Sequence, residues 1–406
     1  MSNIKKIRLS AALILSVTTF SACSNQSAAT LGTETDRSVT EPAVFSAVDS
    51  DNSITSIEPQ ETVKSSAAMA KEQYNVTLPV LSAASALELT KLDLPDINGH
   101  SFNLNALIDD KTFIVSLFDR VGAGGIDCGT GLYNIESKEY RALPDMPYDG
   151  YCAWNSDYVV FKEYNGDFTV AADDESVKLY LYDINACESK LVYTYSFDRD
   201  IELYDHWRNN IVLADDKIYF DDVIINENDN ADRHAYLYSY DIPSGTIEKL
   251  ADDAEYPFEY DDTLLYIKKD NDLYKINSLN GKYDFDLKGY VQMIIPTKNR
   301  LLSFEVLSND DIKRETTWGV KDMLTDECIL KTARTINNPV SSNSFLAFID
   351  FGLDYSPIVY SAEKDSFIVF DDLTGINNVY WRFCNDTGMV IAVDDGETDI
   401  YRFTLK

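Results

Sequence analysis

One short segment of the chain gathers side chains suited to binding a ligand. Asp205, His206, Trp207 and Arg208 follow one another directly. An indole ring can stack on a sugar or a cation, and the neighbouring polar groups can hydrogen-bond to the same ligand. The candidate ligand-binding set also includes three residues that the fold should bring nearby: Tyr256, Asp354 and Tyr355. The competing interpretation is that all of these residues lie in solvated loops of an acidic protein.

No catalytic signature accompanies this segment. Serine-hydrolase and sialidase motifs, a Walker A sequence and a dinucleotide-binding glycine motif are all absent from the sequence. The only histidines are His100, His206 and His234, and neither their spacing nor any C-x-x-C pair indicates a zinc site. Paired aspartates such as Asp109-Asp110 stand in recurrent turns, where Asp is a favoured residue. We therefore predict no catalytic residues, no metal and no cofactor.

The composition indicates an acidic chain with one large folded part. Of the 406 residues, 35 are Lys or Arg and 68 are Asp or Glu, which gives a formal charge of −33 and excludes general nucleic-acid binding. Hydrophobic residues make up 45% of the chain, enough for a sizeable core. Only two aromatic residues, Phe20 and Phe45, precede Tyr74. We therefore place the folded domain at 74–406 and a disordered tether, rich in Ser and Thr, at 23–73.

The folded part shows short strands separated by turns. Apolar or aromatic runs of five to eight residues alternate with clusters of Asp, Asn, Gly and Ser, and no long stretch has helical periodicity. One turn type recurs seven times between apolar runs, and the following strands open at a mean spacing of about 46 residues. These strands begin at Phe113, Tyr158, Ile218, Leu264, Leu301, Phe345 and Met389.

This spacing predicts an all-β fold, a seven-bladed β-propeller of four-stranded blades, although six or eight blades are also compatible with it. The chain ends after the third strand of the last blade. The isolated strand pattern at 87–94 is expected to supply the missing fourth strand and to close the ring. The stretches around 179–191 and 237–250 resemble the LYxYDxxSGxxxxL repeats of TolB-like and YWTD-like bacterial propellers. That resemblance implies a fold and no particular function.

The loops of such a propeller differ between its two faces. The turns between the first and second strands are short and alike, whereas the loops between the second and third strands vary in length, charge and glycine content. Binding residues concentrate on variable loops held by a rigid scaffold. Because strands alternate in direction, the variable loops share a face with the connections between blades, including the 204–208 segment. We expect the ligand on that face.

Cysteine usage gives no disulfide framework. Besides Cys23, the chain contains Cys128, Cys152, Cys187, Cys328 and Cys384. An odd number cannot pair completely, and free cysteines commonly behave as small buried hydrophobes. Trp154 and Trp381 fall in first strands and are expected to pack between blades.

The N-terminus has the pattern of an export signal. Lys5, Lys6 and Arg8 precede an uncharged run of 14 residues at 9–22, which is too short to span a membrane. The following Cys23, with small residues before it, resembles the lipobox of bacterial lipoproteins. This resemblance implies a signal peptide at 1–22 and a lipid bilayer as partner through lipidated Cys23. The alternatives are a plain secreted protein and an uncleaved anchor.

Together these patterns predict a protein of the bacterial cell envelope, lipid-anchored on the extracytoplasmic side of a membrane. Its propeller would serve as a binding or scaffold module for an extracytoplasmic protein or glycan ligand. Two alternatives stay open: a carbohydrate-active hydrolase or lyase with carboxylates at the channel mouth, and an accessory subunit of an envelope complex. An enzyme requires converging carboxylate or His groups, and the sequence alone does not show them.

Overall fold

The computed structural model describes most of the chain from residue 75 onward. The described residues are 75–94, 96–121, 124–148, 150–165, 176–195, 210–226, 229–270, 273–310, 315–333, 336–350, 357–373, 376, 378–394 and 397–406. Regular structure in these ranges is almost entirely β-strand, with one α-helical turn, α2 (Ala83–Ala86), and one 3-10 turn, η1 (Asp371–Leu373). Within the same ranges, no helix is long and apolar enough to cross a membrane.

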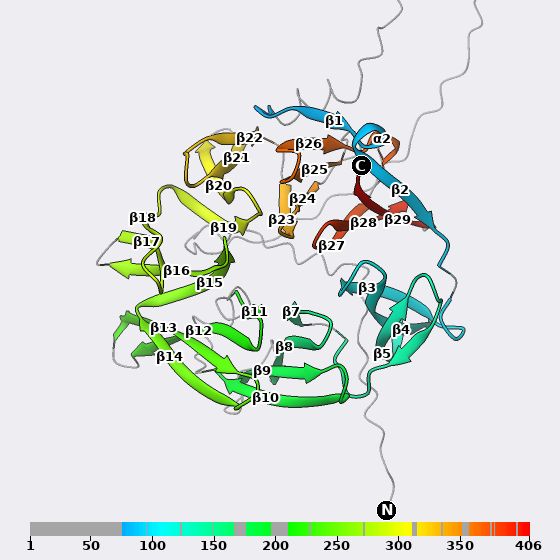
Figure 1. Cartoon of the computed structure of the whole chain (residues 1–406), viewed down its shortest axis with the longest axis horizontal. Helices are drawn as coiled ribbons and strands as arrows, with labels where there is room; N and C mark the ends of the chain where they lie inside the picture. The colour runs from blue at the N-terminus through cyan, green and yellow to red at the C-terminus, as the bar shows by residue number, and fades with distance from the viewer. Residues whose placement is uncertain are drawn as a thin grey trace, which may run out of the picture.

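The described strands form seven sheets arranged in a ring, so the predicted seven-bladed β-propeller is confirmed (Figure 1). We call the four strands of a blade A to D from the centre outward. Blade 1 contains β3 (Ser101–Leu107), β4 (Thr112–Val121), β5 (Gly124–Asn134) and β6 (Tyr140–Ala142). Blade 2 contains β7 (Tyr151–Trp154), β8 (Tyr158–Asn165), β9 (Ser176–Asp183) and β10 (Glu188–Thr194). Blade 3 contains β11 (Val212–Ala214), β12 (Lys217–Asn226), β13 (Asp229–Asp241) and β14 (Thr246–Asp252).

The remaining four blades follow the same order. Blade 4 contains β15 (Ala254–Tyr260), β16 (Thr263–Asp270), β17 (Leu273–Ser278) and β18 (Asp284–Asp286), and blade 5 contains β19 (Tyr290–Pro296), β20 (Leu301–Asp310), β21 (Glu315–Asp322) and β22 (Cys328–Thr332). Blade 6 contains β23 (Ile336–Ser341), β24 (Phe345–Asp350), β25 (Ile358–Ser361) and β26 (Ser366–Val369). Blade 7 contains β27 (Asn378–Cys384), β28 (Thr387–Asp394) and β29 (Glu397–Leu405).

The ring closes through the N-terminal strand, as predicted. β2 (Leu87–Leu92) pairs antiparallel with β29, from Leu87 opposite Leu405 to Leu92 opposite Ile400, and supplies strand D of blade 7. The strand ends two residues earlier than the predicted 87–94. One addition was not predicted: β1 (Val80–Ser82) pairs parallel with β26 as a fifth strand of blade 6. Both strands run along the outside of the ring (Figure 1).

All seven predicted tight turns connect strands A and B. In two of them a side chain closes the turn: Asp109 Oδ1 accepts hydrogen bonds from the backbone N–H groups of Lys111 and Thr112, at 2.8 and 2.7 Å, and Asn155 acts in the same way in blade 2. The recurrent Asp residues at these positions are therefore turn formers. Because the strands alternate in direction, the A–B and C–D turns share one face, which we call the turn face. The B–C loops and the connections between blades share the opposite face, the loop face.

Each of the seven contacts between neighbouring blades has its own apolar cluster. Both tryptophans of the A strands bridge blades, as expected: the Trp381 indole N–H donates to the Phe348 carbonyl at 3.2 Å, and that of Trp154 donates to the Leu107 carbonyl at 2.9 Å. Among the residues that the structure describes, the cluster between blades 3 and 4 is the smallest of the seven, with three buried members.

Candidate functional site

The predicted ligand-binding residues fall mostly outside the described residues. Asp205, His206, Trp207 and Arg208 belong to 196–209, and Asp354 and Tyr355 belong to 351–356. Their mutual placement therefore stays a prediction. Cys23 likewise precedes the described part of the chain. Tyr256 is the one member of the set that the structure describes.

Tyr256 lies at a β-bulge near the loop-face end of β15. Its backbone has φ of +55°, a left-handed conformation that is uncommon for a bulky residue, and its N–H donates to Asp221 Oδ2 at 3.0 Å. The side chain is half-buried and packs against the apolar cluster of blades 4 and 5. Burial raises the pKa of the Tyr256 hydroxyl to about 12. The contact that the structure shows for Tyr256 at this bulge is made by its backbone, and a ligand-binding role of its ring stays a prediction.

The partner of Tyr256 belongs to a buried polar cluster formed by Lys162, Tyr195, Asp221 and Asp222. Lys162 comes from β8, Tyr195 directly follows β10, and the two aspartates are consecutive residues of β12. Lys162 and Asp221 are only 5% and 2% exposed. The Lys162 ammonium lies 5.4 Å from the centre of the Tyr195 ring, a cation–π distance. The hydroxyl of Tyr193 donates to Asp222 Oδ2 at 2.8 Å.

Burial shifts the pKa values of two members of this cluster, Asp221 and Lys162, towards neutral pH. It raises the pKa of Asp221 to about 6, against the opposing effects of the Tyr256 N–H and the Lys162 charge. Burial lowers the pKa of Lys162, while the charges of Cys152 and Asp221 act in the opposite direction. Such shifts occur both at catalytic sites and in structural ion clusters. A catalytic group must touch its substrate, however, and Lys162 and Asp221 are almost wholly covered.

The cluster also flanks the connection between blades 2 and 3. That connection, 196–209, carries four of the predicted ligand-binding residues and lies outside the described part of the chain. Before it, the Tyr195 N–H donates to the Val177 carbonyl at 3.0 Å, and Tyr195 itself is buried. After it, the Asn210 side-chain amide donates to the Pro257 carbonyl at 2.8 Å, next to Tyr256. Both ends of the connection are thus fixed at the polar cluster or beside it.

Replacing Asp221 by Asn should change how stability depends on pH. The folded pKa, about 6, is above the ordinary value of 3.8, so between about pH 4 and pH 6 the folded state keeps a proton that the unfolded chain has lost. Raising the pH through this window therefore destabilises the wild type, by about 3 kcal/mol for a shift of about two units. Asn cannot ionise. The free energy of unfolding of Asp221→Asn, relative to wild type, should rise by up to that amount from pH 4 to pH 7.

Urea unfolding at the two pH values measures this effect. The matched control is Asp216→Asn, at an exposed A–B turn position of the same blade, and the pH-dependent change of Asp221→Asn should exceed that of this control. An unchanged difference for Asp221→Asn would show that Asp221 ionises normally in the folded protein.

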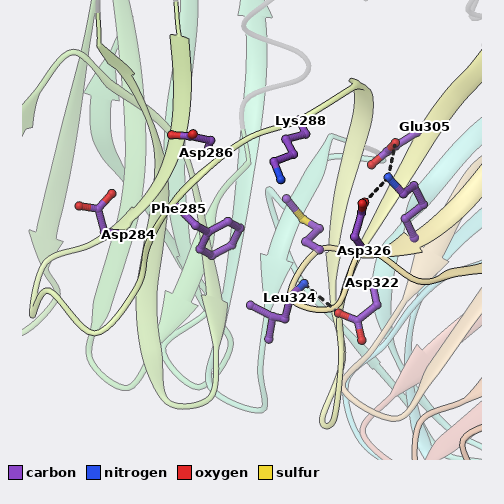
Figure 2. Close-up of a pocket in the computed structure, with 10 residues that line it drawn as sticks. Asp284, Phe285, Asp286, Lys288, Glu305, Asp322, Leu324 and Asp326 are labelled. Carbon is purple, nitrogen blue, oxygen red and sulfur yellow. Dashed lines mark hydrogen bonds and ion pairs between the residues drawn. The ribbon is translucent and has the colours of Figure 1, made fainter.

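A pocket of about 590 Å³ lies elsewhere, between the outer strand of blade 4 and the C–D turn of blade 5. Figure 2 shows Phe285, Lys288 and Leu324 facing the space between the blades, whereas Asp284 and Asp286 point away from it. Its lining residues are Asp284, Phe285, Asp286, Lys288, Glu305, Lys321, Asp322, Met323, Leu324 and Asp326. None of the predicted ligand-binding residues is among them.

Several charged groups of this pocket make contacts within blade 5 or between blades 5 and 6. Lys321 Nζ lies 2.5 Å from Asp326 Oδ1, an ion pair that holds the pKa of Asp326 below its usual value. Arg300 bonds to Asp322 at 3.0 Å and, through two nitrogens, to Asp365 of blade 6 at 2.7 and 2.8 Å. Asp322, a buried acidic group of the pocket, is thus part of an ionic contact that joins blades 5 and 6. We assign the pocket no ligand.

Within the described ranges, one group of three side chains has ligand atoms close enough to share a metal ion: His100, Asp119 and Cys128 of blade 1. Sequence spacing did not indicate this group, because its members come from three segments that only strand pairing brings together. The described cysteines are all free thiols.

The buried polar cluster was also missed by the sequence prediction. Its signal is present in retrospect: Asp221 and Asp222 interrupt an apolar strand between Phe220 and Val223, and Lys162 follows Val159-Val160-Phe161. Charged residues are depleted from strand interiors unless they find partners.

Comparisons with known proteins add similarity of fold. No protein-family model matches the chain, and no curated protein matches it in sequence. An oligogalacturonate lyase in complex with manganese is 12% identical, with a TM-score of 0.44, over 82% of this chain and 97% of that one. The β-propeller domain of the Trilobed protease from Pyrococcus furiosus is 9% identical, with a TM-score of 0.45, over 75% and 93%. The acylaminoacyl peptidase of Pyrococcus horikoshii is 10% identical, with a TM-score of 0.43, over 76% and 53%. These similarities carry no inference about activity or ligand.

Proposed function

We propose that the chain is a bacterial cell-envelope lipoprotein, tethered through lipidated Cys23, whose propeller binds an extracytoplasmic protein or glycan. The ligand binds on the loop face, at the connection between blades 2 and 3. In this proposal the 23–73 segment holds the propeller away from the membrane, and a mature charge more negative than −30 keeps it off anionic headgroups.

The observation that carries the proposed binding site is the attachment of the 196–209 connection. Tyr195 and Asn210 fix its two ends on a rigid support made from blades 2, 3 and 4. Arg208 and Asp205 precede Asn210 by only two and five residues, so the chain itself keeps them within about 7 and 18 Å of that anchor. A variable segment carrying Trp and Arg on a rigid support is the usual composition of a binding centre.

The same buried cluster offers a second candidate function, a hydrolase or lyase acting on carbohydrate. The specific observation in its favour is the carboxyl of Asp221, whose pKa of about 6 would suit a general acid or base. The burial of Asp221 and Lys162 favours the binding role instead, because neither side chain can reach a substrate on the surface. An accessory subunit of an envelope complex would be a binding module of the same kind, with a protein as its ligand.

Trp207→Ala is the variant that tests the binding role. Truncating a Trp at a binding centre costs about 2 kcal/mol or more, which is about a thirtyfold loss of affinity. Two probes are used, detergent-solubilised envelope proteins and envelope polysaccharide. Each probe is passed over the immobilised chain, and the retained material is identified. We expect the material retained by wild type to be lost with Trp207→Ala. Neutralising Asp173, Asp174 and Glu175 together should only weaken the dependence of binding on salt.

The matched control is Asp216→Ala on the turn face, which should bind as wild type does. Melting temperatures of all variants should stay close to that of wild type, because Trp207 is expected at the surface. If Trp207→Ala unfolds the protein while its folded fraction binds normally, Trp207 belongs to the core and the proposed site is wrong.

A further inference from the structure

Three side chains of different chemistry meet at the loop-face end of blade 1. His100 directly precedes β3, Asp119 lies near the end of β4, and Cys128 lies near the start of β5. The His100 Nδ1 and the Asp119 Oδ1 are 2.7 Å apart, and the ligand atoms of all three residues lie within 4.8 Å of one another. The residues are neighbours across two strand pairings and not along the chain.

A β-bulge turns Cys128 into this position. In the β4–β5 pairing, Leu117 is opposite Gly129 and Phe118 is opposite Asp127, so Cys128 is the extra residue between them. The bulge is held by Asp127, whose Oδ1 accepts the N–H of Gly129 at 2.8 Å, and by the left-handed φ of +114° at Gly129. Bulges commonly redirect a side chain beside a functional site. Here the bulge places the Cys128 thiol next to the His100–Asp119 pair.

We propose that His100, Asp119 and Cys128 bind a divalent transition metal ion, Zn²⁺ above the others. Imidazole nitrogen, carboxylate oxygen and thiolate sulfur are the three protein ligand types of zinc. A softer thiolate together with imidazole disfavours Mg²⁺ and Ca²⁺, which select oxygen ligands. Three protein ligands leave a fourth tetrahedral position, which water or a group of a ligand can fill.

The geometry needs little adjustment to accept the ion. Two ligand atoms each about 2.1 Å from a tetrahedral zinc lie about 3.4 Å apart. The His100–Asp119 hydrogen bond must therefore open by less than 1 Å, and the Cys128 Sγ, which lies within 4.8 Å of both other ligand atoms, must come to a similar separation from them. The His100 and Asp119 side chains are 33% and 50% exposed, so an ion can enter from solvent. This proposal does not rest on the proposed binding function. The fourth coordination position of the metal ion would nevertheless lie on the loop face, where we propose that the ligand binds.

Cobalt substitution tests the proposal most directly. The full chain, purified in detergent and freed of metal with a chelator, is titrated with Co²⁺ while its absorption spectrum is recorded. We expect one ion per chain, a thiolate-to-cobalt charge-transfer band and the visible bands of tetrahedral cobalt, with Zn²⁺ displacing the cobalt. Absence of the thiolate band from wild type would overturn the proposal without any variant.

Ligand variants then identify the site. Cys128→Ser should remove the charge-transfer band, and His100→Gln should weaken Zn²⁺ binding by at least about 100-fold, because even loss of a supporting partner costs 10 to 100-fold. Two controls match these changes. Cys328→Ser removes another half-buried thiol, and His234→Gln disrupts an exposed His–Asp pair, at 3.3 Å, that has no third such ligand among the residues that the structure describes. Both controls should bind as wild type does. Equal loss in a control and in its site variant would overturn the proposal.

Discussion

Deleting residues 74–95 should prevent the propeller from folding, whereas deleting 24–73 should leave its thermal stability almost unchanged. The first deletion removes β1, α2 and β2, and thereby exposes the outer edge of β29 along six paired residues. It also removes Leu87 from the apolar cluster of blades 6 and 7. An open sheet edge invites aggregation, and the lost packing costs several kcal/mol. The second deletion removes a segment that we predict to be a disordered tether. Circular dichroism and thermal melting of both deletion variants measure the difference.

Two leucines of β2 give a matched pair for the same question. Leu87 is 1% exposed and Leu89 is 40% exposed, although both pair with β29. Leu87→Ala should cost about 2 to 5 kcal/mol of unfolding free energy, and Leu89→Ala should cost little. Equal stability of the two deletion variants, or of the two leucine variants, would contradict closure of the ring through β2.

Replacing Cys23 by Ala should remove the protein from the membrane fraction or leave it as the full-length precursor. The basis is the sequence pattern alone: a basic start, a short apolar run and the bulky Phe20, which disfavours ordinary signal-peptidase cleavage. Two or more acyl chains hold a protein stably on a bilayer, so the expected effect is nearly all-or-none. Cell fractionation and the mass of the mature chain measure it. Cys328→Ser is the control and should stay in the membrane fraction. A Cys23→Ala protein that is processed and membrane-bound like wild type would exclude the lipid anchor.

The architecture could be predicted from the sequence because its signals are local and repeated. Each A–B turn is marked by Asp, Asn or Ser between two apolar runs, and seven such turns at similar spacing define the blades. The closing strand at 87–92 was also visible, since the last blade ends after three strands. The strand β1 could not be predicted, because three residues next to Pro79 carry no periodic pattern. Its partner β26 is also far away in the sequence and pairs with it in parallel.

The candidate sites depend on contacts that no local pattern encodes. Asp221 meets the Tyr256 backbone only because blades 3 and 4 are neighbours in the ring. Cys128 joins His100 only because a bulge shifts the register of β5 by one residue. A sequence shows that a charged residue interrupts a strand, but its partner is set by blade packing and strand register.

The central claim is that the ligand binds on the loop face, and site-specific photo-crosslinking tests it most directly. A benzophenone side chain is placed at Glu163, exposed near the loop-face end of β8, or at Asp216 on the turn face. Each full chain is expressed in its own cells and irradiated. We predict covalent adducts with an envelope protein or glycan from position 163, abolished by Trp207→Ala, and none from position 216. Adducts that form from position 216 and not from 163 would contradict the account.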